Sequence, residues 1–449
     1  MNLSFPAQVA EPVLLAARAL DALRTDAELV SLEALDAAAL SAAQRGCRVL
    51  AALAAGATRD DYARSLVSRA FFPDGGGAFQ AALAGSTRLL AHSAARALAT
   101  PQLGRDAPPQ AIRGAAALRA PHLALATSIV ELLVAASHAF GHAMGGCHAL
   151  RAVGALLVAF DATPPAKILL ANSAAYAAPA TLGSPRPPDR RGSAVAPPRA
   201  AALYLVKATC KLVSTVAAAQ GAEAARAVPD VCDLALNHVA PLAAGGHAPE
   251  LLPPLLDLAD HLLCHQWAAF VAKPEAPPGS PAGVALQYRS APPTLRDGAP
   301  ARHFRTLCDL LAVGVAGVDL PPHAVKRALR ALSNANAKSR LFDFAVFSAE
   351  FRAKLCDRLL DALLDRRHDL LCDDLAAVLH ALAAADLDGF FGSFVPAKLQ
   401  NAPGLDDAQR RAVLAGWGRA PDAPSFVANL NDAVNDVAFY RLQNLHAME

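Results

Sequence analysis

Apolar residues recur every three or four positions through most of this 449-residue chain, which is the spacing of one helical face. From residue 301 onward the predicted helices follow one another closely: His303–Val315, Pro322–Asn334, Ser348–Leu364, Asp373–Ala385, Asp388–Leu399, Asp406–Ala415 and Ser425–Asn444. Nearer the N-terminus, one further predicted helix carries a single apolar face: Val13, Leu14, Ala17, Leu20 and Leu23. Helix pairs that recur about every 40 residues are typical of HEAT-like repeats. The pattern therefore predicts an all-α fold, an α-solenoid of HEAT-like antiparallel helix pairs.

Proline divides the chain into three parts. Of the 33 prolines, 20 lie between Asp161 and Pro300, with dense runs at about 184–199 and 273–300. Proline lacks the backbone donor that a helix interior needs, so we expect these runs to be exposed insertions between helices. We predict three regions: N-terminal helical repeats at 1–160, helical repeats interrupted by the two proline-rich loops at 161–300, and C-terminal helical repeats at 301–449.

Composition supports the helical prediction. Ala supplies 109 residues and Leu 67, and these two are among the strongest helix formers. The chain is 54% hydrophobic and 18% charged, which is too apolar for a disordered protein. A single hydrophobic core stops growing near roughly 250–300 residues, so a chain of this length needs several domains or a solenoid.

Net charge and cysteine usage limit which partners and which cellular compartment we expect. The net charge of +2 gives no field that would recruit nucleic acid or an anionic membrane, so we expect neither as a partner. The first ten residues lack a basic segment followed by an apolar one, so we expect no signal peptide. The eight cysteines are scattered, which predicts reduced thiols in the cytosol or nucleus.

The most apolar stretch, Leu123–Met144, could be mistaken for a membrane span. It contains Glu131, His138 and His142, and a spanning helix rarely tolerates such groups near its centre. We interpret it as a buried core helix.

Two clusters of histidine and cysteine are the candidates for chemistry. His138 and His142 lie one helical turn apart with Cys147 and His148 close behind, a set that suits zinc, although no glutamate follows His138 to activate a water. A metal-dependent enzyme that uses these four residues is therefore kept as a third hypothesis, after the two given at the end of this section. Two histidines packed within a helix are the favoured interpretation.

The second cluster is His261, Cys264 and His265. Neighbours on a helix point about 100° apart, so Cys264 and His265 do not face each other as a nucleophile and base would. The chain also has no phosphate-binding loop and no Gly-x-Ser-x-Gly elbow. We expect no catalytic, cofactor or metal site, and no enzymatic activity.

The last hundred residues stand out from the alanine background through a series of short pieces. These include Asp386-Leu387-Asp388-Gly389-Phe390-Phe391, Phe394-Val395-Pro396, Gly404-Leu405-Asp406, Pro424-Ser425-Phe426, Asn435-Asp436 and Phe439-Tyr440-Arg441-Leu442. The motif residues that we single out as structural or interaction sites are Asp386, Asp388, Phe390, Phe391, Pro396, Pro424, Phe426, Asn435, Asp436, Tyr440 and Arg441.

These residues also have a local structural interpretation. Asp386 or Asp388 can cap a helix that buries Phe390, Phe391 and Phe394, and Pro396 would bend or end it. Asp406 and Ser425 can cap the two helices that follow. The last helix then has one buried stripe: Phe426, Leu430, Val434 and Val437. Taken singly, each of these residues is best interpreted as core or cap.

Taken together, in their order and spacing, the pieces resemble the C-terminal end of the exportin-6 family, nuclear export receptors of the karyopherin-β superfamily. The resemblance implies a superhelical receptor that binds protein cargo together with GTP-bound Ran and contacts Phe-Gly nucleoporins. It implies actin, in particular profilin-bound actin, as the cargo, and shuttling between nucleus and cytoplasm.

Two differences from the family shape these expectations. Family receptors are longer, and their N-terminal repeats make the principal Ran contacts, so we expect this chain to correspond to the C-terminal part and not to bind Ran alone. Family members are also usually acidic, whereas this chain has a net charge of +2. The alternative function is a generic α-solenoid scaffold that binds an unrelated protein and is indifferent to the nucleotide state of Ran.

Overall fold

The computed structural model describes residues 37–58, 77–98, 109–140, 146–165, 198–219, 221–244, 248–272, 292–317 and 320–448. The chain divides into two compact units, Met1–Pro254 and Leu255–Glu449. The three-region division made from proline density stays a prediction about where the repeats fall. The predicted helix at 12–23 and most of the first proline-rich run lie outside the described residues.

The described part of the first unit is entirely helical. Its helices are α2 (Ala37–Ala57), α4 (Gly77–Leu98), α5 (Pro109–Phe140), α6 (Cys147–Ala162), α8 (Pro198–Ala218) and α9 (Ala222–Cys232). Helix α9 continues through the π-helical turn η3 (Asp233–Val239) into α10 (Ala240–Ala244), and the 3-10 turn η4 (Pro249–Leu251) follows. Helix α8 begins at Pro198, so the first proline-rich run ends two residues earlier than predicted. The reason is that proline suits the first turn of a helix, where its missing donor is not needed.

Helix α5 is the core of this unit. It packs against α2, α4 and α8, and its most buried residues are fully enclosed: Leu125, Ala126, Ile129, Val130, Leu132, Leu133 and Ala136. Among the described residues, Arg119–Phe140 is the one helix long and apolar enough to cross a membrane, and 56% of its most apolar window is buried inside the protein. Core helices pass the same test of length and composition, and the helices packed around α5 agree with the prediction of a core helix.

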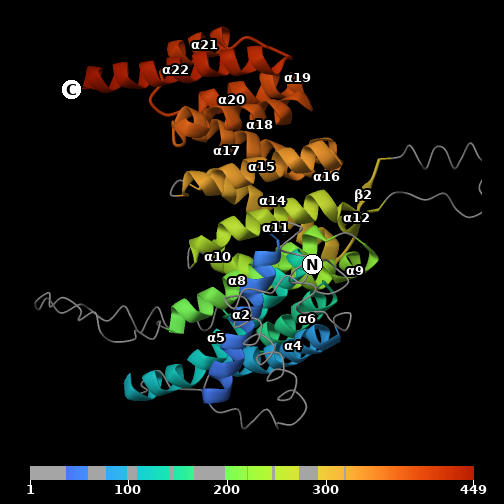
Figure 1. The fold of residues 1–449 in the computed structure, drawn as a ribbon. Coiled ribbons are helices and arrows are strands. Elements are labelled where there is room, and N and C mark those ends of the chain that lie inside the picture. Colours follow the sequence, from blue (N-terminus) through green and yellow to red (C-terminus); the bar gives the residue numbers. More distant parts are fainter. Residues whose placement is uncertain are drawn as a thin grey trace, which may run out of the picture. The chain divides into compact units, whose positions relative to one another are not determined.

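The second unit follows with more and shorter elements (Figure 1). They are α11 (Leu252–His265, mostly in this unit), α12 (Trp267–Phe270), β1 (Val271–Ala272), β2 (Thr294–Leu295), α14 (Ala299–Ala316), α15 (Pro322–Ser339), η5 (Leu341–Asp343), α16 (Ala345–Phe347), η6 (Ser348–Arg352), α17 (Ala353–Leu364), η7 (Asp369–Leu371), α18 (Cys372–Ala384), α19 (Leu387–Gly389), η8 (Phe390–Phe394), α20 (Val395–Gln400), α21 (Asp407–Gly416) and α22 (Ala423–Met448). All seven helices predicted beyond residue 301 are present, with bounds that differ by a few residues.

Helices of the second unit stack on their neighbours in chain order. Helix α14 packs on α15 and α17, α15 also packs on α18, and α18 packs on α17 and α22. Each helix therefore buries one face on its pair and another on the adjacent pair, which is how a repeat protein builds a continuous core. The predicted all-α solenoid is confirmed.

One element departs from the all-helical prediction. Val271 and Leu295 pair across a two-stranded antiparallel sheet, and the Arg296 backbone N–H donates to the Phe270 carbonyl at 2.8 Å. The prediction of an uninterrupted loop at 273–300 is therefore wrong for its last residues. Residues 294–295 form β2, and Gly298, with φ of 78°, precedes the first turn of α14. Pairing between strands distant in sequence leaves no periodic signal that the local pattern could reveal.

All eight cysteines are free, as expected for reduced thiols. Burial raises the pKa of Cys47, Cys210 and Cys356 to about 12. A thiol with such a pKa stays protonated near neutral pH, so these three behave as small hydrophobic residues and not as nucleophiles.

Candidate functional site

The turn that opens the Asp386–Phe394 segment is organised by Asp386. Its side chain accepts from the Gly389 backbone N–H at 2.9 Å and from the Arg352 guanidinium at 3.2 Å. A Cβ at position 389 would lie 2.3 Å from the same carboxylate, so a larger residue there would displace the Asp386 side chain. Of the two caps that the sequence left open, Asp386 is the one used. Asp388 instead lies on the surface, where it pairs with Arg419.

An aromatic cluster follows this turn. Phe390 is 4% exposed and stacks on Phe394 with ring centroids 5.4 Å apart. It meets Phe391 edge-on at 5.2 Å and Phe426 of α22 at 5.9 Å. Trp417 closes the cluster at 6.4 Å from Phe390. Phe390 and Phe426 are buried as predicted, whereas Phe391 and Phe394 are only half-buried because they lie at the rim of the cluster.

Pro396 does not end the helix, contrary to one of the two predicted outcomes. The segment runs on to Gln400, and Pro396 lies in the first turn of α20 directly after the π-helical turn η8. A proline is tolerated in a first turn because its missing N–H has no helical partner there in any case. The wider π-turn before it carries the change in hydrogen bonding that proline imposes.

A pocket of about 290 Å³ opens beside this segment, between α17, α18 and η8. Cys356, Leu382 and Phe394 line its apolar part, and the Arg352–Asp386 pair lies on its lining. Its size suits one apolar side chain of a partner protein.

Helix α22 is tied to the helices before it by polar side chains. Arg441 donates to the Leu364 carbonyl at 3.0 Å, to the Asp365 carboxylate at 3.2 Å and to the Pro403 carbonyl at 3.2 Å. Asn435 accepts from the Arg366 guanidinium. Two motif residues thereby hold α22 against the turns that follow α17 and α20.

The start of α22 corrects another prediction. The Ser425 backbone N–H donates to the Asp422 carboxylate at 2.9 Å, so Asp422 supplies the cap that was assigned to Ser425. The same hydrogen bond, the largest cause, lowers the pKa of Asp422. Pro424 lies exposed in the first turn of the helix. Asp406 was assigned correctly: it accepts from the Gln409 backbone N–H at 2.8 Å and forms a full capping box.

The face of α22 that points away from its buried stripe is exposed and partly apolar. Phe439 is 62% exposed and Leu442, one turn later, is 58% exposed. Asp436 is also exposed, and Tyr440 is half-buried with its ring 5.8 Å from that of Phe439. Large apolar side chains left in solvent on neighbouring turns are a feature of protein-binding surfaces. The motif therefore divides into residues that hold α22 in place and residues that face outward.

The two histidine clusters are the remaining candidates for chemistry. In the described part of the chain no three His, Cys, Asp or Glu side chains gather as metal ligands, and His142 lies outside that part. His138 Nε2 lies 3.3 Å from Thr215 Oγ1. In the second cluster the Cys264 thiol donates to Asp260 at 3.1 Å, and burial raises its pKa to about 12, which opposes a role as nucleophile.

Pattern reasoning missed the partners of the motif residues. Arg352, Arg366 and Arg419 carry no motif of their own, and Asp422 was missed although it lies only three positions before Ser425. Arg352 and Asp386 are 34 positions apart, and Arg366 and Asn435 are 69 apart. No local spacing rule connects positions so distant.

The stacked helix pairs and the outward face of α22 define a helical-repeat protein of the kind that binds other proteins over an extended surface. Residues 283–443 match the protein family described as "Exportin-6, C-terminal TPR repeats". The chain is 27% identical over 217 residues to exportin-6 of Mus musculus and of Homo sapiens, which covers 48% of this chain and 18% of each relative. It is 27% identical over 240 residues to exportin-6 of Danio rerio, covering 54% of this chain and 20% of the relative.

The chain therefore resembles exportin-6, a nuclear export receptor, and it spans about a fifth of the length of these relatives. No solved structure matches it significantly. The resemblance predicted from the C-terminal motifs is confirmed, and the matched region extends upstream of them to residue 283.

Proposed function

We propose that the chain acts as a nuclear export receptor, or as part of one, that carries protein cargo out of the nucleus. The single observation behind this proposal is the match of residues 283–443 to the C-terminal repeats of exportin-6. By the same resemblance, the cargo is actin or profilin-bound actin, loaded with GTP-bound Ran, and the protein shuttles between nucleus and cytoplasm. Phe-Gly nucleoporins are its contacts during passage.

The stacked helices of the second unit support a binding mechanism and not a catalytic one. A solenoid holds its faces rigid because each pair is packed on the next, so little ordering entropy is lost when a partner binds. In this proposal the exposed face of α22, with Phe439 and Leu442, contributes apolar contact area to the cargo. The pocket beside Phe390 would take one side chain of the partner.

In this proposal, Ran contacts a different part of the receptor from the cargo. The N-terminal repeats of family receptors make the principal Ran contacts, so the chain alone should bind cargo weakly and Ran hardly at all. GTP hydrolysis would act on the assembled receptor, which then releases cargo in the cytoplasm.

Purified full chain provides the test. We would immobilise it and measure binding of profilin–actin, in parallel with Ran loaded with GDP or with a non-hydrolysable GTP analogue. We expect binding of profilin–actin in the micromolar range, weakened at least fivefold in a double variant with Phe439→Ser and Leu442→Ser. Leu370→Ser, which changes a leucine 91% exposed on η7, serves as a matched surface control.

The alternative, a generic scaffold, predicts a different result from the same measurement. A stably helical protein that binds neither profilin–actin nor Ran in either nucleotide state would overturn the export proposal. A cargo signal that the α22 double variant leaves unchanged would reject the role assigned to that helix.

A further inference from the structure

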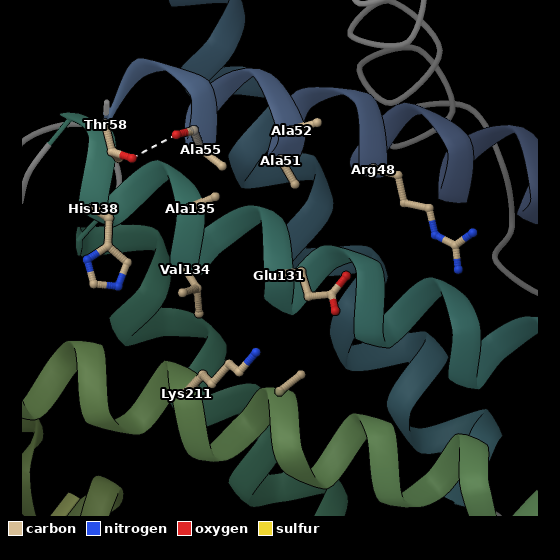
Figure 2. Close-up of a pocket in the computed structure, with 11 residues that line it drawn as sticks. Arg48, Ala51, Ala52, Ala55, Thr58, Glu131, Val134, Ala135, His138 and Lys211 are labelled. Carbon is tan, nitrogen blue, oxygen red and sulfur yellow. Dashed lines mark hydrogen bonds between the residues drawn. The ribbon is translucent and has the colours of Figure 1, made fainter. Parts of the chain in front are cut away.

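A groove in the first unit, outside the matched family region 283–443, is formed by three helices (Figure 2). Helices α2 and α8 both pack on α5, and their facing sides leave a depression of about 720 Å³ over it. Ala51 and Ala55 of α2, Val134 and Ala135 of α5, and Ala208 of α8 form its surface.

The groove has the length and the small lining side chains of a helix-binding site. Along α2 and the residue after it, the lining runs from Arg48 to Thr58, ten residue steps, which at about 1.5 Å per step is about 15 Å or roughly three helical turns. Alanine projects only a methyl group, so the backbone of a partner helix can approach closely. The lining residues on each wall recur at spacings of three and four, the repeat of a helix laid alongside.

Three charged residues face this groove, one from each helix: Arg48, Glu131 and Lys211. All three are exposed, and within the described residues none of them forms an ion pair. The two cations on opposite walls outnumber the single carboxylate on the floor. A partner with carboxylates along both edges of its helix would complement them.

An exposed aromatic residue extends the groove by one turn. Tyr204 is 61% exposed and precedes Ala208 on α8 by four residues, which places it on the same face of that helix. Tyrosine is among the residues that most often dominate binding energy at protein interfaces.

We propose that this groove binds an amphipathic α-helix of a partner protein, with small apolar residues along its centre and acidic residues on both flanks. The groove is formed by α2, α5 and α8, whereas the cargo contacts proposed above lie on α22 and beside Phe390, so the two can be tested separately. It adds a second kind of protein contact to the chain, by the helix-in-groove mode.

The experiment uses a fluorescein-labelled, lactam-bridged helical peptide of 15 residues with an Ala/Leu stripe flanked by glutamates. Its fluorescence anisotropy is measured against the full chain. We expect saturable binding that weakens at least tenfold in Ala55→Trp, which fills the groove, and in Lys211→Glu, which reverses one wall. Position 55 is exposed, so tryptophan fits there without disturbing the core.

Two variants control for nonspecific effects. Ala42→Trp changes an exposed alanine of α2 that does not line the groove, and Arg151→Glu reverses an exposed charge on α6. Both should bind the peptide within twofold of the unchanged protein. A peptide with lysines in place of the glutamates should bind poorly, and Lys211→Glu should improve its binding.

Three results would overturn the proposal. One is a peptide that fails to bind, or binds all variants equally. Another is a dimer in solution that Ala55→Trp dissociates, since the occupant would then be a second copy. The last is photo-crosslinking from benzoylphenylalanine at position 52 into the same chain, since the groove would then be filled internally.

Discussion

Helices of the first unit pack mainly through alanine and leucine, with Phe79 and Phe160 also buried, whereas those of the second unit use more phenylalanine and several arginines. Alanine makes up 71 of the 254 residues of the first unit and 38 of the 195 residues of the second. Phenylalanine shows the reverse, with six residues in the first unit and eleven in the second. Small side chains let helices approach closely, and large ones interlock specifically and leave fewer alternative arrangements.

Polar contacts between helices sharpen the difference. In the second unit, Arg358 donates to the Ala312 carbonyl at 3.1 Å and Lys398 bridges Asp357 and Asp361 at 2.5 and 2.8 Å. In the described part of the first unit, a buried threonine such as Thr209 bonds back to its own helix, to the Leu205 carbonyl at 2.9 Å. Such local bonds satisfy the hydroxyl but connect no helices. Two of the described polar contacts that do connect helices of this unit involve histidine: His138 with Thr215 at 3.3 Å and His238 with Asp161 at 2.8 Å.

The comparison helps to explain why the family match falls in the second unit. A close-packed alanine interface accepts many sequences of small apolar residues. An arginine that donates to three specific oxygens, or a glycine that lies close to a carboxylate, can be replaced by few other residues without loss of those contacts. The matched family region, residues 283–443, lies entirely in the second unit.

The largest effect should come from the aromatic cluster. Phe426 is 0% exposed, so Phe426→Ala should lower the free energy of unfolding of the second unit by about 3–5 kcal/mol. Both tryptophans of the chain, Trp267 and Trp417, lie in this unit, so their fluorescence during urea unfolding reports on it directly. Phe439→Ala, at a 62% exposed position, should cost less than about 0.5 kcal/mol. Equal costs would mean that the cluster is not the core of the unit.

The alanine interface of the first unit should instead be destabilised by larger side chains, because it has no room for them. Ala94 is 0% exposed and its neighbour Ala95 is exposed, so Ala94→Leu should destabilise by about 1–3 kcal/mol and Ala95→Leu by almost nothing. Hydrogen exchange of the α4 and α5 peptides measures both. Similar protection in the two variants would show that this unit is loosely packed, contrary to our interpretation.

The polar attachment of α22 should contribute less than the aromatic cluster. Arg441→Met keeps the stem but leaves the Leu364 and Pro403 carbonyls without their donor, at an expected cost of about 1–2 kcal/mol by tryptophan fluorescence. Arg411→Met is the matched control, because Arg411 bonds only to the Asp407 carbonyl of its own helix. If Arg411→Met cost as much as Arg441→Met, the loss would reflect general charge removal.

The smallest effect should be the acid response of one exposed pair. A bidentate hydrogen bond from Arg305, the largest cause, lowers the pKa of Glu350 from its usual 4.5. A carboxyl with a lowered folded pKa stabilises the fold above its unfolded pKa and loses that contribution as the pH falls through the folded pKa. Glu350→Gln should therefore lower the Tm by roughly 1 °C near pH 7, and the difference should vanish in acid. A difference that does not shrink as the pH falls below 4.5 would contradict the ion pair as its source.

Local interactions are what the amino-acid sequence by itself determined. Helix positions beyond residue 301 were predictable because the apolar face repeats every three or four residues, and the Phe426 to Val437 stripe is buried as that repeat predicts. The Asp406 cap was predictable because its partners lie two and three positions away.

Contacts between distant segments were decided only by the tertiary structure. The Arg352 that pairs with Asp386 lies 34 positions away, and Arg441 reaches carbonyl groups 38 and 77 positions away. The groove likewise exists only because α2 and α8 pack on opposite sides of α5. Packing joins residues whose separation along the chain has no period, so no pattern in one sequence can specify such pairs.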